Sequence, residues 1–501
     1  MVNTDLQGKS GSFWEEMCPA TNFPPLEEGL KVDVAIIGGG IAGITAAILL
    51  KENGQTVAVI EANRIVKDVT IGTTAKISVA PNMIYSNLIS TLGKAKSQKF
   101  AMANMNSLKK IADIVSKRDI NCDFKFVQFY IYTELADKVE TIKSEINAAK
   151  ELGLTVFYTE NVPLPFETGP AALYENQAQF HPRKYLLALS DDIPGEGSYV
   201  FENTRAIDMK EGKIKEVLTD KGSIMADNVI VATNTPIYDP DMLYNHLHPG
   251  RSYVMGVYAK GEFPEGMFVD FDPVHTYRTA PTQKGQLIIV AGEHHDAGKV
   301  TNTKEYYKRL ENYARQHLDI ESIEYHWSSQ DNVTDDGLPL IGMTSKEGIY
   351  VATGFGFWGM TTGTTAAMVL TDLITGKENQ FADLFDPTRF KPVESTEDIL
   401  KQESTVKSVT GKEISRSKIL DTVDLSPDEA KTFGEDGEMF AAYMDDDGSI
   451  HALQAVCTHR GCLLTWNNAE KSWDCPCHGS RFNFDGEILH GPAVKELRRY
   501  I

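Results

Sequence analysis

The sequence contains no long apolar run. None of its 501 residues lies in a stretch of 18 or more consecutive apolar residues, the length that a membrane-spanning helix requires. The opening MVNTDLQGKSGSFWEEM also lacks the basic and then apolar pattern of a secretory signal peptide. We therefore expect a cytoplasmic protein without a membrane span.

Positive charge and cysteine are both scarce. The chain has 49 Lys and Arg against 70 Asp and Glu, a formal charge of −21, which opposes binding to nucleic acid or to anionic membranes. Of six cysteines, Cys18 and Cys122 stand alone and are interpreted as small core residues, whereas four fall within 21 residues near the C-terminus. In a cytosolic chain such a cluster indicates metal binding rather than a disulfide scaffold.

The stretch from Val32 to Glu61 has every part of a dinucleotide-binding unit. A β-branched strand leads into Gly38-x-Gly40-x-x-Gly43, then an apolar helix, then a second strand that ends at Glu61. The first glycine allows the tight turn, the second lets a pyrophosphate approach the backbone, and the third lets the helix pack close to the strand. The helix N-terminus offers N–H groups to phosphate, and Glu61 can accept ribose hydroxyls. These parts predict a bound dinucleotide and do not distinguish NAD from FAD.

Two further segments are candidates for the surroundings of the ligand. In the segment GTTAK, the side chains of Thr73, Thr74 and Lys76 could line a phosphate or a flavin edge, although an ordinary capped turn fits these residues equally well. The run 227–234 has the pattern of a buried strand that ends in small residues, among them Thr233. Parallel strands deliver such ends to a ligand.

The second half of the chain predicts an inserted domain and a late return to the first. Long strands and one helix over about 243–330 indicate a substrate-facing domain. A strand then leads through Gly354-Phe-Gly356-Phe-Trp-Gly359 into a helix. No second strand and no ribose-binding acid follow this second GxGxxG, so we expect no separate NAD(P)H domain. A single nucleotide site that is completed by a segment much later in the chain favours a flavoprotein.

The predicted fold class is α/β plus all-β. We expect a Rossmann-like FAD domain with an inserted substrate domain of mixed antiparallel sheet and helices, followed by a small β-domain. The length, with 42% hydrophobic residues, allows two or three such domains. The expected boundaries are 1–80, 171–242 and 331–376 for the FAD-binding domain, 81–170 and 243–330 for the substrate or cap domain, 377–412 for a polar linker and 413–501 for the last domain.

The cysteine cluster has the form of a metal site built from two loops. Cys457-x-His459 and Cys475-x-x-His478 supply two thiolates and two imidazoles, the ligand set of a [2Fe–2S] centre in which histidines replace cysteines on one iron. A Cys2His2 zinc site is the alternative, although zinc loops usually pair cysteine with cysteine and histidine with histidine. Ser480 can donate a hydrogen bond to a cluster sulfur, which raises the reduction potential.

Cys462 and Cys477 remain at matching places in the same two loops. We expect a disulfide between them that clamps one loop to the other, worth on the order of 3 kcal/mol. Such a bond would be unusual in a reducing cytosol.

Several of these stretches resemble known families. VDVAIIGGGIAGITAA, VIVATNT, WSSQD, DGLPLIG and ATGFGFWGM make the region 13–376 similar to the FAD-dependent oxidoreductases of the D-amino-acid oxidase and glycine oxidase superfamily, and about 420–501 resembles a Rieske domain. The resemblance implies FAD bound at Gly38, Gly40, Gly43 and Glu61, with Thr73, Thr74 and Lys76 near the flavin and Gly354, Gly356, Phe357, Trp358, Gly359 and Met360 at its pyrimidine side. Phe482 stands where high-potential Rieske domains carry a tyrosine, which implies a lower potential here.

We expect an FAD-dependent dehydrogenase of a small amine or amino acid. The substrate would deliver a hydride to the flavin, and the electrons would leave singly through the Cys/His cluster to an external electron-transfer partner or oxygen. A two-electron donor that feeds a one-electron centre explains why the two domains share a chain. Two alternatives stay open: a reductase or desaturase-like enzyme in which electrons enter through the Rieske centre, and a non-catalytic electron relay between proteins.

The candidates for the substrate pocket are ring-bearing residues on strands of the inserted domain or beside the flavin loop. They are His294, Tyr258 and Trp358 as catalytic candidates, with His295, Tyr253 and Phe357 as further ones, and core packing is the alternative for each aromatic. Because adjacent residues of a strand face opposite ways, at most one of His294 and His295 points into a pocket. Arg183 and Arg251 could bind a substrate carboxylate, with a surface ion pair as the favoured alternative.

Overall fold

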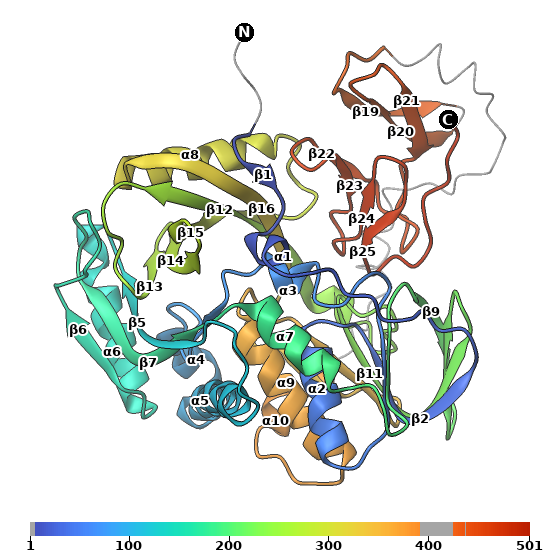
Figure 1. Ribbon diagram of the computed structural model, residues 1–501, viewed down its shortest axis with the longest axis horizontal. Helices are drawn as coiled ribbons and strands as arrows, with labels where there is room; N and C mark the ends of the chain where they lie inside the picture. Colours follow the sequence, from blue (N-terminus) through green and yellow to red (C-terminus); the bar gives the residue numbers. More distant parts are fainter. Residues whose placement is uncertain (1–5, 391–423, 436) are drawn as a thin grey trace.

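A computed structural model describes residues 6–390, 424–435 and 437–501 of the chain. Figure 1 shows a large N-terminal unit, residues 6–390, and a smaller C-terminal unit of strands, drawn in red, which starts at residue 424. The predicted linker 377–412 lies outside the described residues from 391 onward. Within the described part of the chain, no helix has both the length and the apolarity that a membrane crossing would need.

The dinucleotide motif lies in a sheet of eight strands, whose core is parallel. Its order is β17-β18-β11-β2-β3-β8, with β10 beside β11 and β9 beside β10. β2, β3, β8, β11 and β18 run parallel to one another, as the sequence predicted for a Rossmann-like domain. The strands are β2 Leu30–Ile37, β3 Val57–Ile60, β8 Tyr199–Phe201, β9 Ala206–Lys210, β10 Lys215–Thr219, β11 Ser223–Asn234, β17 Leu340–Met343 and β18 Ile349–Thr353.

Two apolar helices cover this sheet and pack on each other. α2 (Ile41–Glu52) is buried along almost its whole length, and α9 (Gly359–Ile374) packs against it. Figure 1 shows both helices on the side of the molecule away from the C-terminal unit. The other helices of the N-terminal unit are α1 Phe13–Glu16, α3 Val69–Gly72, α4 Tyr85–Leu92, α5 Lys94–Lys117, η1 Ala136–Lys138, α6 Val139–Glu151, α7 Pro182–Asp191, η2 Leu243–His246, α8 Lys304–His317, α10 Ala382–Phe385 and η3 Pro387–Arg389.

The inserted domain is built on a second, ten-stranded sheet. Its order is β1-β16-β12-β15-β14-β13-β5-β7-β4, and β6 pairs with β7. Most neighbours are antiparallel, because the chain turns back through short connections. The strands are β1 Lys9–Ser10, β4 Lys76–Ile77, β5 Lys125–Tyr132, β6 Val156–Thr159, β7 Ala171–Gln179, β12 Leu247–Ala259, β13 Met267–Phe271, β14 Val274–Thr282, β15 Gly285–Asp296 and β16 Ile320–Thr334.

Some expected boundaries differ from the observed sheets. β7 and β4 belong to the inserted sheet, although the sequence assigned both to the FAD-binding domain, because their pairing partners lie there. The start of the expected linker is also folded. Phe381, Leu384 and Phe385 are buried, and Arg389 pairs with Asp336 at 2.7 Å. Burial of this short apolar cluster anchors residues 381–390 to the N-terminal unit.

The C-terminal unit consists of two small antiparallel sheets. One contains β19 Ala430–Glu435, β20 Glu438–Met444 and β21 Ile450–Gln454, and the other contains β22 Thr465–Asn467, β23 Ser472–Asp474, β24 Arg481–Asn483 and β25 Ile488–His490. Its own core includes Leu453, Trp473 and Phe482. In Figure 1 this unit lies beside the end of the sheet that carries β12 and β16.

Candidate functional site

The glycine turn after β2 can take no side chains without clashes. Gly38 has φ +111°, and a Cβ there would lie 2.5 Å from the carbonyl oxygen of Ala232 on β11. A Cβ at Gly43 would lie 2.0 Å from the carbonyl oxygen of Gly38, so the helix can approach the strand only with glycine. The α2 N-terminus has no side-chain cap at Gly40. The N–H of Ile41 donates to the Thr70 hydroxyl at 3.2 Å, and the next N–H groups of the first turn remain available to a phosphate.

Glu61 lies directly after β3, beside the same turn. Its carboxylate accepts hydrogen bonds from the backbone N–H groups of Gly39 and Asn63, both at 2.9 Å. Burial raises the pKa of Glu61 above its ordinary value, while these two bonds oppose that shift. Glu61 and Thr233 line a groove of about 150 Å³ that runs along Gly38–Gly40. This groove has the residues that would hold the diphosphate and ribose of a dinucleotide.

A larger cavity of about 420 Å³ continues from this groove. The two share Gly40, Val69, Thr70, Ala232 and Asn234. The predicted flavin neighbours that line the larger cavity are Thr73, Thr74, Lys76, Gly356, Phe357, Trp358, Gly359 and Met360. Gly354 instead packs below the loop, where a Cβ would lie 2.5 Å from Thr334.

Asp331 holds the flavin loop in a strained conformation. The carboxylate accepts from the N–H of Phe357 at 2.7 Å and from the Asn234 amide at 2.7 Å. Phe357 has φ +67°, an unfavourable region for a side chain of this size. The buried hydrogen bond offsets that strain. Asp331 also lines the cavity, and burial raises its pKa. The sequence offered this residue only within the WSSQD resemblance, although a carboxylate in a buried strand is itself a usable signal.

Of the ring-bearing substrate candidates, His294 lies in the cavity wall together with the flavin-loop rings. It contacts the Phe357 ring edge to face at 5.2 Å, and burial lowers its pKa. His295 points the opposite way, where its Nε2 and the hydroxyl of Tyr253 lie 2.8 Å apart in the core. Tyr258 lies outside this cavity, with its hydroxyl 2.6 Å from that of Thr282 near the outer edge of the sheet. Tyr258 therefore has no contact with the site.

Lys76 places a buried amine in the cavity wall. Its amine donates to the hydroxyls of Thr74 at 3.0 Å and Thr276 at 2.8 Å, and the hydrogen bonds and ion pairs found among the described residues give it no carboxylate partner. Burial, and then the nearby charge of Arg278, hold the pKa of Lys76 well below its ordinary value. The cavity therefore contains an amine that is biased toward its neutral form.

Neither candidate arginine is placed to bind a substrate carboxylate. Arg183 is buried and donates to the carbonyl oxygens of Val66 and Pro19, which fixes the N-terminal segment. Arg251 is 1% exposed and pairs with Glu470 and Asp474 of the C-terminal unit, both at 3.0 Å. The expected surface ion pairs are therefore wrong for both, because both guanidinium groups are buried, that of Arg183 against earlier segments of the chain and that of Arg251 against the C-terminal unit.

The metal ligands predicted from sequence lie together between two loops, Cys457–Cys462 (the first cluster loop) and Cys475–Ser480 (the second cluster loop). The sulfurs of Cys457 and Cys475 are in contact, and the rings of His459 and His478 lie 4.9 Å apart. Nδ1 of each histidine is buried and has no hydrogen-bond partner among the described residues. Two buried imidazole nitrogens without partners, in the same two loops as the two cysteine sulfurs, fit the ligand set of a two-iron cluster, because metal bonds would satisfy them.

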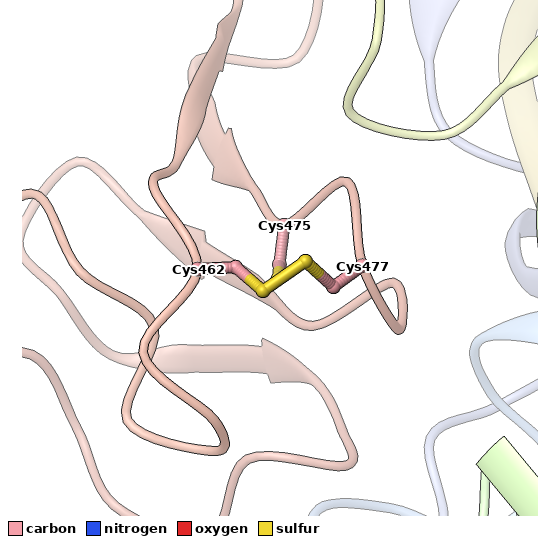
Figure 2. A group of neighbouring side chains, drawn as sticks. All are labelled: Cys462, Cys475 and Cys477. Carbon is pink, nitrogen blue, oxygen red and sulfur yellow. A yellow bond between two sulfur atoms is a disulfide. The ribbon is translucent and has the colours of Figure 1, made fainter. Parts of the chain in front are cut away.

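A disulfide joins the two loops beside these ligands. Figure 2 shows the Cys462–Cys477 bond with Cys475 next to it. The sulfurs of all three lie within 4.8 Å of one another, but the two in the disulfide are not available as thiolate ligands. The Ser480 hydroxyl donates to the Cys457 sulfur and accepts from the N–H of Ala493 at 3.0 Å.

The histidine edge of the cluster site faces the N-terminal unit. Tyr244, on η2, meets the rings of His478 and His459 edge to face at 4.9 and 5.9 Å. Arg460 stacks over the other side of that tyrosine at 4.7 Å. Tyr244 was absent from the sequence candidates, because nothing in its own segment indicates a partner more than 200 residues away.

Close backbone contacts hold the second cluster loop against the N-terminal unit. A Cβ at Gly298 would lie 2.6 Å from the nitrogen of Pro476, and one at Gly479 would lie 2.5 Å from the Gln330 amide. Gln330 donates to the carbonyl oxygen of Gly479 at 2.8 Å. A Cβ at Gly298 would meet backbone atoms of the second cluster loop and so would push the two units apart, whereas one at Gly479 would displace the Gln330 side chain.

A short hydrogen-bonded chain connects the flavin loop to this cluster loop. Asp331 binds Asn234, Asn332 donates to Asn234 at 3.0 Å and to Thr235 at 2.8 Å, and Thr235 reaches the carbonyl oxygen of His478 at 3.5 Å. The cavity and the metal site therefore share a continuous buried network.

Comparison with known families agrees with both sites. Residues 33–373 match the FAD dependent oxidoreductase family (DAO), and residues 415–501 match the Rieske [2Fe-2S] domain. The protein YhfW of Bacillus subtilis (strain 168), whose name assigns it to the Rieske 2Fe-2S iron-sulfur proteins, is 36% identical over 497 residues and covers 97% of each chain. The second match excludes the zinc alternative for the Cys/His site.

Solved structures share the fold of the N-terminal unit. Glycine oxidase from Geobacillus kaustophilus aligns with a TM-score of 0.59 at 18% identity, over 72% of this chain and 99% of that one. L-proline dehydrogenase from P. horikoshii aligns with a TM-score of 0.60 at 21% identity, over 73% and 98%. A stretch of 96 residues, 19% of this chain, is 35% identical to the cytochrome b6-f complex iron-sulfur subunit 1 of Nostoc sp. (strain PCC 7120) and covers 53% of that protein.

The glycine turn with Glu61 agrees with the FAD dependent oxidoreductase family, and the paired Cys/His loops agree with the Rieske [2Fe-2S] domain. The chain belongs to the FAD-dependent oxidoreductase family that includes the amino-acid oxidases, carries a Rieske domain as its C-terminal unit, and has FAD and a [2Fe–2S] cluster as its cofactors.

Proposed function

We propose that this protein oxidises a small amine or amino acid and passes the electrons through its Rieske cluster to an external acceptor. When bound, FAD supplies a hydride acceptor and the cluster supplies a one-electron carrier. The observation that carries the proposal is the orientation of the cluster ligands. His459 and His478 face Tyr244 of the N-terminal unit, which supports electron transfer between the flavin and the cluster of the same chain.

The cavity supports a small-molecule substrate. Its wall is mainly apolar, with a few polar groups, including Lys76, Asn82, Ser252 and His294. Such a wall is typical of sites that orient one small ligand.

Lys76 and His294 suit amine oxidation. An amine must be neutral before its C–H bond can release a hydride, so a base has to take the ammonium proton. Lys76, whose pKa is lowered by burial, can accept that proton. His294 is also biased toward its neutral form by burial and can orient the substrate against Phe357 and Trp358.

An anaerobic titration tests the proposal. Purified protein is mixed with a panel of secondary amines and amino acids while flavin bleaching is followed by absorbance and the reduced cluster by EPR. We expect one substrate class to bleach the flavin and to produce the Rieske signal together. Reduction only by dithionite would contradict the proposal. If candidate compounds reoxidise a flavin that dithionite has reduced, the reductase alternative is favoured instead.

A further inference from the structure

The groove for the diphosphate end of FAD has one wall that belongs to the Rieske domain. On one side lie Gly38–Gly40, Glu61 and Thr233, and on the other lie Leu489, His490, Gly491, Ala493 and Val494. The two sides are separated by more than 250 residues of sequence. Since this groove runs into the flavin cavity, both cavities are parts of one elongated site.

His490, the last residue of β25, occupies the centre of this wall. Its side chain is 4% exposed, and its Nδ1 is hydrogen-bonded to the carboxylate of Asp68, which directly precedes α3. Its Nε2 is buried and has no partner among the described residues. A buried ring nitrogen without a partner is unfavourable, and a polar ligand in the adjoining groove would satisfy it.

The same segment also touches the surroundings of the cluster. The N–H of Ala493 donates to Ser480, whose hydroxyl binds the Cys457 sulfur. Residues 489–494 therefore lie between the two cofactor sites and contact both. Asp68, the partner of His490, directly precedes α3, and α3 lines the flavin cavity. The contact between the two units therefore reaches the flavin cavity as well.

We propose that residues 489–494 of the Rieske domain form part of the FAD-binding site, with His490 hydrogen-bonded to the diphosphate–ribose half of FAD. FAD binding and docking of the Rieske domain then strengthen each other, since any ligand that contacts both units favours their association. This assignment goes beyond the proposed function and depends neither on the substrate nor on the direction of electron flow.

The first test measures the affinity of the full-length, cluster-loaded apoflavoprotein for FAD by fluorescence quenching. We expect His490→Ala to raise the Kd for FAD about tenfold, the usual effect of losing one hydrogen bond to a charged group. His490→Gln, which keeps a donor at this position, should recover part of the loss. EPR of the reduced cluster establishes that each variant is loaded equally.

The matched control is Lys304→Ala. It removes another ion pair between the same two units, Lys304 with Asp428 at 3.0 Å, at a place that lines neither cavity. We expect its Kd for FAD to be unchanged. An equal loss in both variants, or none in His490→Ala, would overturn the proposal.

Hydrogen exchange of the wild-type protein provides a second test without a variant. Adding FAD to the apoflavoprotein should slow amide exchange at residues 488–494. It should leave exchange unchanged at residues 450–454 of β21, which pair with β20 inside the C-terminal unit. Exchange at residues 488–494 that is the same with and without FAD would overturn the proposal.

Discussion

The two cofactor sites are built in opposite ways. The four cluster ligands fall within 22 residues and come from two loops of one small unit. The groove and cavity that we propose for FAD combine the glycine turn of residues 38–43 with the flavin loop near 354–360 and with residues 489–494 of the other unit. Metal bonds need only a few well-placed atoms, whereas a long organic cofactor needs walls from many elements. A local change should therefore remove one cofactor and leave the other.

The largest expected effect is complete loss of the cluster in Cys475→Ser. A hydroxyl does not replace the thiolate on iron, and Cys475 is buried against Cys457. The Rieske EPR signal and the bound iron should disappear, while the flavin absorbance remains because the glycine turn is intact. Loss of flavin together with iron would show that the two sites do not form separately.

Gly43→Ala should produce the converse result. Its Cβ would lie 2.0 Å from the carbonyl oxygen of Gly38, so the turn must open. We expect FAD to bind at least about a hundredfold more weakly, with the cluster retained. Gly29→Ala is the control, because its Cβ would be 3.4 Å from the nearest atom, the carbonyl oxygen of Ser223, and Gly29 lines neither the groove nor the cavity. Titration of apoflavoprotein with FAD measures both.

Arg251→Met tests how firmly the two units are joined. Arg251 and Arg481 together balance the charges of Glu470 and Asp474 in a buried network, so removing Arg251 leaves two buried carboxylates with Arg481 as their shared cation. We expect a loss of about 2–3 kcal/mol in the stability of the docked Rieske domain. Chemical unfolding followed through the cluster absorbance measures it.

Arg251→Met is compared with the control Lys304→Ala, and the KM for a carboxylate substrate tests whether Arg251 binds substrate instead. Lys304→Ala removes a partly exposed pair and should cost less than about 1 kcal/mol. The KM for a carboxylate substrate should stay the same in Arg251→Met. A large rise in KM would return Arg251 to the substrate site, as the sequence alone allowed.

Lys76 gives the flavin site a pH dependence that the cluster should lack. Its pKa lies below the ordinary lysine value because burial disfavours the charged amine. If neutral Lys76 accepts the substrate proton, flavin reduction slows as the pH falls through that lowered pKa and the amine becomes charged. Lys76→Met should reduce the rate about a hundredfold and abolish this limb. Stopped-flow reduction over a pH series checks it, and an unchanged profile would exclude Lys76 as the base.

The smallest expected effect is a change in the reduction potential of the cluster. Ser480→Ala removes the hydrogen bond to the Cys457 sulfur. We expect the potential to fall on the order of tens of millivolts while the EPR signal persists. A redox titration of the variant measures it, and an unchanged potential would contradict the role of Ser480.

The sequence predicted the parts of each site that depend on local geometry. Strand, glycine turn, helix and Glu61 follow in the predicted order, because a tight turn against a helix admits only glycine at Gly38 and Gly43. His294 and His295 point opposite ways, as strand geometry requires. The loop cysteines form the disulfide that their matching places indicated.

Long-range contacts explain where the structure differs from the sequence predictions. Tyr258 was chosen because it lies on a strand of the inserted domain, but that end of the strand lies away from the cavity. The residues that fix the flavin loop and face the cluster, Asp331 and Tyr244, carry no sign in their own segments of the partners they meet.

By itself, the sequence determined the two cofactors and the local chemistry that holds them, since those depend on residue types at short spacing. Only the tertiary structure decided that Arg251 joins the two units, that Tyr244 covers the cluster histidines, and that residues 489–494 close the FAD groove. These contacts unite segments hundreds of residues apart, so they arise from how the buried surfaces pack rather than from any local pattern.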